Sequence, residues 1–176
     1  MKFAARFAIV LLCATGALEA QPRDIDVRLR GHQHPVQLDS IAIWNVIPAP
    51  QARTFTAVRH VLAELGVPFT SADSVSGVFY KSPFTTSRQI LGKRMSWAMS
   101  CGHGLTGPNA DSYRIHMAYA IFLEPTDGQQ TRVGVALASG ANTTEGTSTR
   151  PVPCASTGAL EQEIAMRVRA RAQVRE

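Results

Sequence analysis

Alternating apolar and polar positions single out residues 113–139 as the most regular part of the chain. From Tyr113 to Leu123 every second residue is large and apolar, and most of the residues between them are small, polar or charged. A period of two over this length is typical of a strand that is buried on one face. The alternation returns over residues 133–137 after a polar segment, so the two runs predict an antiparallel hairpin.

The register of this hairpin follows from the need to place both apolar rows on the same face of the sheet. A two-residue turn at Asp127 and Gly128 would put the rows on opposite faces, because a shift of one residue reverses every side chain. A three-residue loop from Thr126 to Gly128, with Gly128 in the left-handed conformation, avoids this. We therefore predict the pairs Ile121 with Val133, Tyr119 with Val135, and Met117 with Leu137.

Two helices are predicted from apolar residues at helical spacing. Residues 51–65 form the first and end before Gly66, which suits a helix C-cap. Residues 156–172 form the second, which Ser156 or Thr157 can cap. Further strands are expected within residues 36–47, at 78–81 and at 94–100, and residues 82–87 are expected to form a loop. The predicted fold is α+β, a single antiparallel sheet of roughly four to six strands with both helices packed on one face.

The first twenty residues are expected to be an export signal rather than part of the fold. Lys2 and Arg6 precede an apolar run too short to span a membrane, and cleavage is expected after Ala20. The alternative is a lipoprotein signal with Cys13 as the lipidated residue, but the preceding Leu12 is larger than such sites prefer. The expected location is therefore periplasmic or secreted, with no transmembrane segment after signal removal.

Beyond the signal, residues 21–35 are expected to be a disordered lead-in, residues 36–172 a single domain, and residues 173–176 a tail. The lead-in contains His32 and His34, but no third ligand stands at suitable spacing, so no metal site is predicted. The formal net charge of +5 favours contact with anionic partners without deciding the fold. Arginines 167, 169 and 171 complement the dipole of the last predicted helix and offer weak contact with an anionic surface.

Cys101 opens a glycine-rich segment, residues 101–109. This segment lacks the Lys-Ser/Thr end of a phosphate-binding loop. A dinucleotide-binding fingerprint would need a helix after the glycines, and a strand is predicted there instead. His103 could serve Cys101 as a base if the cysteine were a nucleophile. An exported chain with Cys101 and Cys154 remaining favours a disulfide between them instead. The bond would close a loop of about fifty residues and stabilise the fold by about 4 kcal/mol in the chain-entropy treatment.

The order of elements carries a remote resemblance to a known family. Cys101 and Gly102 precede the long strand, and residues 153–161 open the last helix. This layout resembles a group of uncharacterised exported bacterial domains and, more distantly, the helix-grip domains of the BamC lipoprotein of the outer-membrane barrel-assembly machine. The resemblance implies a helix-grip-like architecture, carries over no catalytic residue, and does not transfer function.

The sequence is expected to encode an exported, non-enzymatic binding or scaffold domain of the bacterial cell envelope. Its partner would be an envelope protein or a second copy of the chain, meeting the sheet face that the helices leave uncovered. On the long strand that face carries Arg114, His116, Ala118, Ala120 and Phe122.

Two other functions stay open. One is a carrier of a small ligand or lipid, with a pocket between the helices and the apolar row. The other is an enzyme that uses Cys101 and His103. No cofactor is predicted, and no nucleic-acid partner, because aromatic residues do not alternate with the basic ones. Residues 140–153, rich in Gly, Thr and Ser, are expected to form a surface loop, which includes a glycosylation motif at Asn142.

Overall fold

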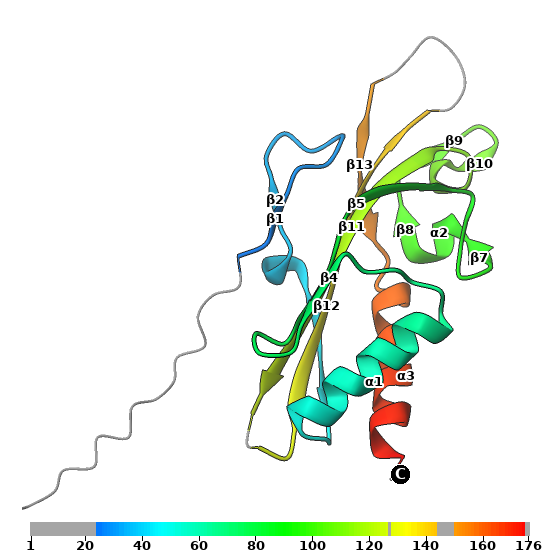
Figure 1. Cartoon of the computed structure of the whole chain (residues 1–176). Helices are drawn as coiled ribbons and strands as arrows, with labels where there is room; N and C mark the ends of the chain where they lie inside the picture. Colours follow the sequence, from blue (N-terminus) through cyan, green and yellow to red (C-terminus); the bar gives the residue numbers. More distant parts are fainter. Residues whose placement is uncertain (1–23, 127, 144–149, 175–176) are drawn as a thin grey trace, which may run out of the picture.

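The computed structural model describes residues 24–126, 128–143 and 150–174 (Figure 1). The predicted signal segment lies outside these residues, as do residues 144–149 of the predicted loop. The described chain has an α+β fold with a mainly antiparallel sheet, in agreement with the predicted fold class.

The main sheet has seven strands, more than predicted, because several of its edge strands are very short. In spatial order they are β4 (Ser71–Asp73), β5 (Val78–Ser87), β11 (Arg114–Pro125), β12 (Thr131–Asn142), β13 (Val152–Ser156) and β8 (Met99–Ser100), and β3 (Ile43–Ile47) pairs with β12 beside this path. The smaller sheets and turns are β1 (Asp26–Val27) with β2 (Val36–Gln37), β6 (Gln89–Ile90) with β7 (Lys93–Arg94), β9 (His103–Gly104) with β10 (Gly107–Pro108), and the short helices η1 (Asp39–Ile41) and η2 (Asn109–Asp111).

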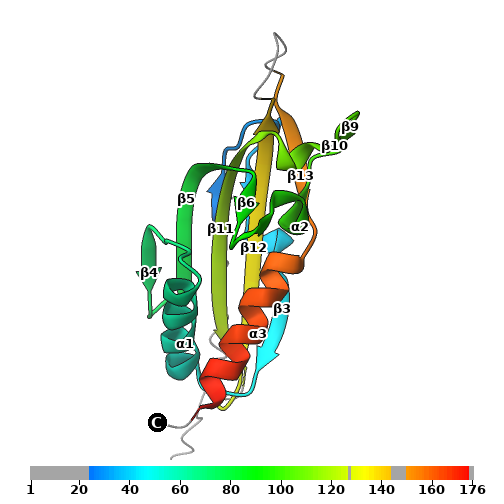
Figure 2. The ribbon, with the colours of Figure 1, turned by 90° about the vertical axis from the view of Figure 1, so that its right-hand side faces the viewer.

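Helices α1 (Gln51–Glu64) and α3 (Ala159–Gln173) lie side by side on one face of the sheet (Figure 2). They pack against the apolar row of β11, as the spacing of their apolar residues predicts. This main core contains aromatic contacts such as Phe55 with Phe79, whose ring centroids are 4.4 Å apart. The row from β11 consists of Ile115, Met117, Tyr119, Ile121 and Leu123.

The hairpin of β11 and β12 forms as predicted, but its register differs by two residues. Leu123 pairs with Val133, Ile121 with Val135 and Tyr119 with Leu137, so the three predicted pairs are wrong. Both apolar rows still share a face, because a shift of two residues preserves the orientation of every side chain. Pro125 pairs with Thr131, and the connection between them is therefore longer than the three-residue loop.

Two other segments differ from their predictions. Residues 82–87 continue strand β5 instead of forming a loop, and Pro83 is tolerated because a register shift opposite Ala118 provides a bulge there. Residues 95–98 form the short helix α2 (Met95–Ala98) in place of a continuous strand. Met95 begins this turn and Met99 follows it in β8, and both side chains are completely buried in the main core.

The expected disordered lead-in is ordered from residue 24 onward and packs on the opposite face of the sheet. Ile25, Val27 and Leu29 alternate with charged residues, a short period-two pattern that identifies an amphipathic extended segment. The chain returns through β2 to Leu38, which is fully buried. Residues 24–38, the N-terminal segment, thereby create a second hydrophobic core on the face without helices.

Candidate functional site

Most of the sheet face expected to be an open interaction surface is covered. Ala118 and Ala120 are fully buried and Phe122 is 1% exposed, because the N-terminal segment packs over them. The small residues at the centre of this row leave room for the chain that covers it. Of these five residues, only Arg114, which is exposed, and His116, which is partly exposed, remain accessible. Both lie near the start of β11, which is the upper end of the strand in Figure 1.

The N-terminal segment crosses the sheet at its upper end in close contact with β12. A β-carbon on Gly140 would lie 1.7 Å from the backbone oxygen of Arg30, so only glycine fits there. Nε2 of His32 lies 2.8 Å from the backbone oxygen of Ser139, within hydrogen-bond distance. His32 is therefore a structural contact on the sheet. Within the described residues no group of three His, Cys, Asp or Glu could hold a metal ion.

Cys101 and Cys154 form the predicted disulfide, with their Cα atoms 4.4 Å apart. The bond joins the residue after β8 to the neighbouring strand β13, and a disulfide is compatible with an oxidising compartment. A cysteine held in this bond has no free thiol, so it cannot act as a nucleophile while the bond is intact. His103 is exposed in the β9–β10 hairpin.

The β9–β10 hairpin projects from the body of the domain beside this disulfide (Figures 1 and 2). Asn109 closes its base, because its backbone nitrogen donates to the Gly102 oxygen at 3.0 Å and its side chain donates to the Cys101 oxygen at 3.2 Å. At the tip, between Gly104 and Thr106, the side chain of Leu105 is fully exposed. The hairpin thus presents an apolar tip on a base held by a covalent bond.

The three arginines of the last helix are all engaged within the chain. Arg167 forms an ion pair with Glu163 at 2.8 Å, and Arg171 one with Glu64 at 3.2 Å. Arg169 donates to the backbone oxygen of Val46 at 2.8 Å. Each exposed ion pair adds little stability, but it neutralises charge locally. This geometry weakens the prediction that these arginines contact an anionic surface.

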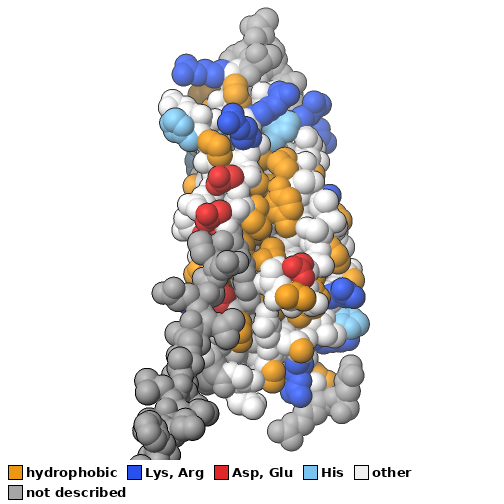
Figure 3. All heavy atoms as spheres, turned by 60° about the vertical axis from the view of Figure 1, so that its left-hand side comes forward, with side chains coloured by type: hydrophobic (Ala, Val, Ile, Leu, Met, Phe, Trp, Pro, Cys, Tyr) orange, Lys and Arg blue, Asp and Glu red, His pale blue; other side chains and the backbone are white. Residues whose placement is uncertain are grey.

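The cations at the upper end of the sheet are different. Within the described part of the chain, none of the following five exposed side chains forms an ion pair: Arg30, Arg88, Lys93, Arg94 and Arg114. We call this group the basic end. Figure 3 shows several Lys and Arg side chains near the upper end of the face that carries the N-terminal segment. The pKa of His116 is lowered by burial and by the neighbouring charges of Arg30 and Arg114, which marks a positive local potential.

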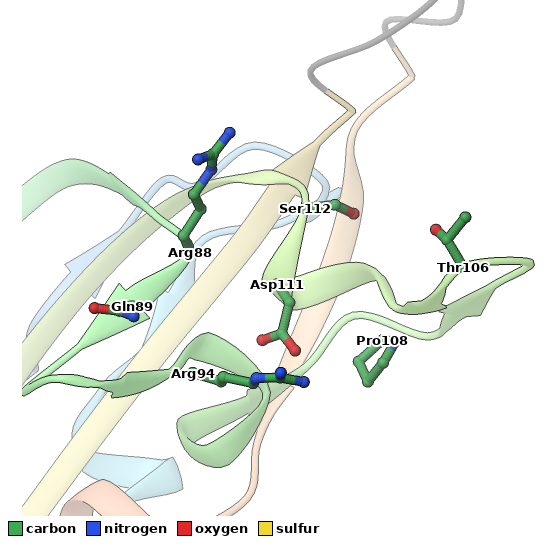
Figure 4. Close-up of a pocket in the computed structure, with 7 residues that line it drawn as sticks. All are labelled: Arg88, Gln89, Arg94, Thr106, Pro108, Asp111 and Ser112. Carbon is green, nitrogen blue, oxygen red and sulfur yellow. The ribbon is translucent and has the colours of Figure 1, made fainter.

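An open polar pocket of about 300 Å³ lies within the basic end (Figure 4). Its lining residues are Arg88, Gln89, Arg94, Thr106, Pro108, Asp111 and Ser112. The carboxylate of Asp111 accepts hydrogen bonds from the backbone nitrogen and the hydroxyl of Ser96, at 2.8 and 3.0 Å, so it caps the first turn of α2. Two arginines and part of the β9–β10 hairpin therefore surround the carboxylate of Asp111, whose hydrogen bonds to Ser96 hold it in place.

The loop that carries these arginines has an unusual backbone. Arg88 and Leu91 have φ values of 65° and 52°, in the left-handed region that side-chain-bearing residues rarely adopt. Leu91 and Gly92 form the tip of the β6–β7 hairpin, and Leu91 packs against the main core, which compensates for its conformation. The β6–β7 hairpin therefore holds Arg88 just before its first strand and Arg94 at the end of its second strand.

A small buried cavity of about 20 Å³ lies between α3 and the apolar row, where a carrier would need its pocket. The cavity can hold about one water molecule. Glu161 is almost completely buried beside it, and Oε1 of this residue accepts a hydrogen bond from the Ser156 hydroxyl at 2.5 Å. Oε2 has no protein partner. Burial raises the pKa of this carboxyl, and the Ser156 hydrogen bond opposes the change only in part.

No protein-family model matches the chain, and no curated protein matches it significantly in sequence. Among the described residues, no helix combines the length and the apolar character needed to cross a membrane. The site must therefore be interpreted from its own geometry. Arg114 and His116 were predicted from the sequence, whereas Arg30, Arg88 and Arg94 were not, because Arg30 is far from the other two in the sequence and only the fold brings it to the same end of the sheet.

Proposed function

We propose that this chain is an exported, non-enzymatic binding domain of the bacterial cell envelope, and that its binding surface for a negatively charged partner is the basic end. The observation that carries the proposal is the contrast between the arginines of α3 and the cations of the basic end. Arginines on α3 have partners within the chain, whereas the five cations of the basic end form no ion pair among the described residues. Cations that no carboxylate neutralises attract anions from solution.

Two further observations favour this function over its alternatives. The cavity between helices and sheet is about 20 Å³, far below the few hundred Å³ that a ligand carrier needs. Cys101, the proposed nucleophile of the enzyme alternative, is held in a disulfide. The packing of two helices on one face of an antiparallel sheet is an architecture that by itself carries no function.

The proposal is tested by retention on immobilised heparin, used as a polyanion probe, with increasing salt. The test variant is Arg88→Gln/Arg94→Gln/Arg114→Gln. The matched control, Arg167→Gln/Arg169→Gln/Arg171→Gln, removes the same charge from residues that have internal partners. We expect the test variant to elute at much lower salt than the wild type, because fewer counterions are released on binding, and the control to lose much less.

Equal losses in the two variants would show that retention reflects net charge alone and would overturn the proposal. Thermal unfolding of both variants establishes that each is folded before its retention is interpreted. A pull-down from envelope extract with the wild type and the test variant then identifies partners, and those that depend on the basic end should be anionic.

A further inference from the structure

The β9–β10 hairpin adds an apolar element to the basic end. Leu105 is fully exposed at its tip, where solvent surrounds the side chain. The neighbouring hairpin residues Thr106 and Pro108 line the same pocket as Arg88 and Arg94, so the hairpin and the arginines are adjacent in space. Figure 4 shows this arrangement, with Thr106 on the projecting hairpin and Arg94 below Asp111.

The hairpin is well held at its base. The Cys101–Cys154 bond and the two hydrogen bonds from Asn109 fix the point where it leaves the domain. Gly102 and Gly107 have φ values of 84° and 121°, which glycine adopts at little cost and which allow the sharp turns at both sides of the hairpin. A hairpin that is already fixed at its base loses little conformational entropy when its tip binds a partner.

We propose that the basic end docks on an anionic phospholipid bilayer, with Leu105 entering the interface and the surrounding cations contacting lipid headgroups. This inference rests on the proposed function and names the partner of the same surface. A bilayer suits these residues because weak anchors act together there: one apolar group gives marginal binding, and neighbouring basic residues add attraction to the anionic headgroups. A planar bilayer also needs no shaped pocket to accept an isolated leucine.

The experiment is co-sedimentation with vesicles of phosphatidylcholine alone and with vesicles that also contain phosphatidylglycerol. The variants are Leu105→Ser, the matched control Val75→Ser, and Arg88→Gln/Arg94→Gln. Val75 is 90% exposed in a different turn, so the control removes an equally accessible apolar side chain outside the basic end.

We expect the wild type to bind only vesicles that contain phosphatidylglycerol. Leu105→Ser should weaken this binding about tenfold through the lost apolar contact, whereas Val75→Ser should leave it unchanged. Loss of the two arginines should weaken it about fivefold for each charge. In Leu105→Trp, quenching by brominated lipid should exceed that of the wild type, whose own tryptophans provide the background, and Val75→Trp should show no such increase.

The possible outcomes separate this inference from the proposed function. Wild-type retention on heparin without binding to either vesicle would keep the proposed function, assign the surface to an acidic protein or soluble polyanion, and overturn membrane docking. Vesicle binding that Leu105→Ser and Val75→Ser affect equally would overturn the role of the hairpin. Absence of both heparin and vesicle binding would overturn the proposed function as well.

Discussion

The backbone oxygen of Arg30 occupies the space where a side chain on Gly140 would begin. A β-carbon there would be 1.7 Å from this oxygen and 3.3 Å from the backbone oxygen of Val152. Gly140 lies on β12 opposite His116, so the contact joins the N-terminal segment to the two central strands of the sheet. Because Gly140 has no side chain, the N-terminal segment can cover the sheet face without helices. The same contact places Arg30 at the basic end.

Gly140→Ala is expected to lower the free energy of unfolding by about 3 kcal/mol or more, because backbone atoms cannot move aside as a flexible side chain can. Limited proteolysis should also cut the N-terminal segment faster in this variant. Gly66→Ala is the control, since its β-carbon would meet nothing within 4 Å and only the backbone conformation at φ +64° opposes it. A cost for Gly140→Ala no larger than that of the control would contradict the close contact.

Removal of the disulfide is expected to lower stability without changing the fold. The bond spans 53 residues, and its loss in Cys101→Ala/Cys154→Ala should cost about 4 kcal/mol. Thermal unfolding of the wild type with and without reductant provides an independent measurement, and reductant should not change the melting temperature of the double variant. Equal melting temperatures for oxidised wild type and double variant would exclude a stabilising bond.

Glu161 should make stability depend on pH in a defined direction. Burial raises the pKa of its carboxyl above the ordinary value of 4.5, so the folded state holds this proton more tightly than the unfolded state. The associated stability is fully present below pH 4.5 and is lost as the pH rises through the raised pKa. Glu161→Gln should remove this loss, so that the variant gains stability relative to the wild type between acidic and neutral pH.

Chemical denaturation at a series of pH values measures this effect. Glu163→Gln serves as the control because it makes the same chemical change at a neighbouring position on α3 whose side chain reaches Arg167 at the surface. Parallel pH dependence in the wild type and Glu161→Gln would show that the buried carboxyl does not titrate between the two states.

The positive potential at the basic end can be measured through His116. Burial lowers the pKa of this imidazole most, and the charges of Arg30 and Arg114 lower it further. Arg114→Gln should therefore raise the pKa of His116 towards its ordinary value, as followed by an NMR titration of the ring. Arg132→Gln removes a cation that pairs with Glu124 on another part of the sheet and should leave His116 unchanged. An unchanged titration in Arg114→Gln would contradict the electrostatic argument.

Local patterns in the sequence were sufficient for the main elements. The period of two over residues 113–123 required a strand with one buried face, and the spacing of Phe55, Val58 and Leu62 required a helix with an apolar stripe. The pairing of Cys101 with Cys154 also followed from the sequence once export was assumed. The strand and the helix depend only on residues close together in the sequence, and the disulfide had only one possible pairing. Both can therefore be read from the sequence.

The tertiary structure alone decided the register, the covered face and which cations gather at the basic end. Any shift of two residues keeps both apolar rows together, so the pattern could not distinguish Leu123–Val133 from Ile121–Val133. The pattern at Ile25, Val27 and Leu29 is too short to show which surface it covers. Arg171 and Arg88 look equally free in the sequence, yet only Arg171 finds a carboxylate, that of Glu64, because folding brings together partners that are distant in the chain.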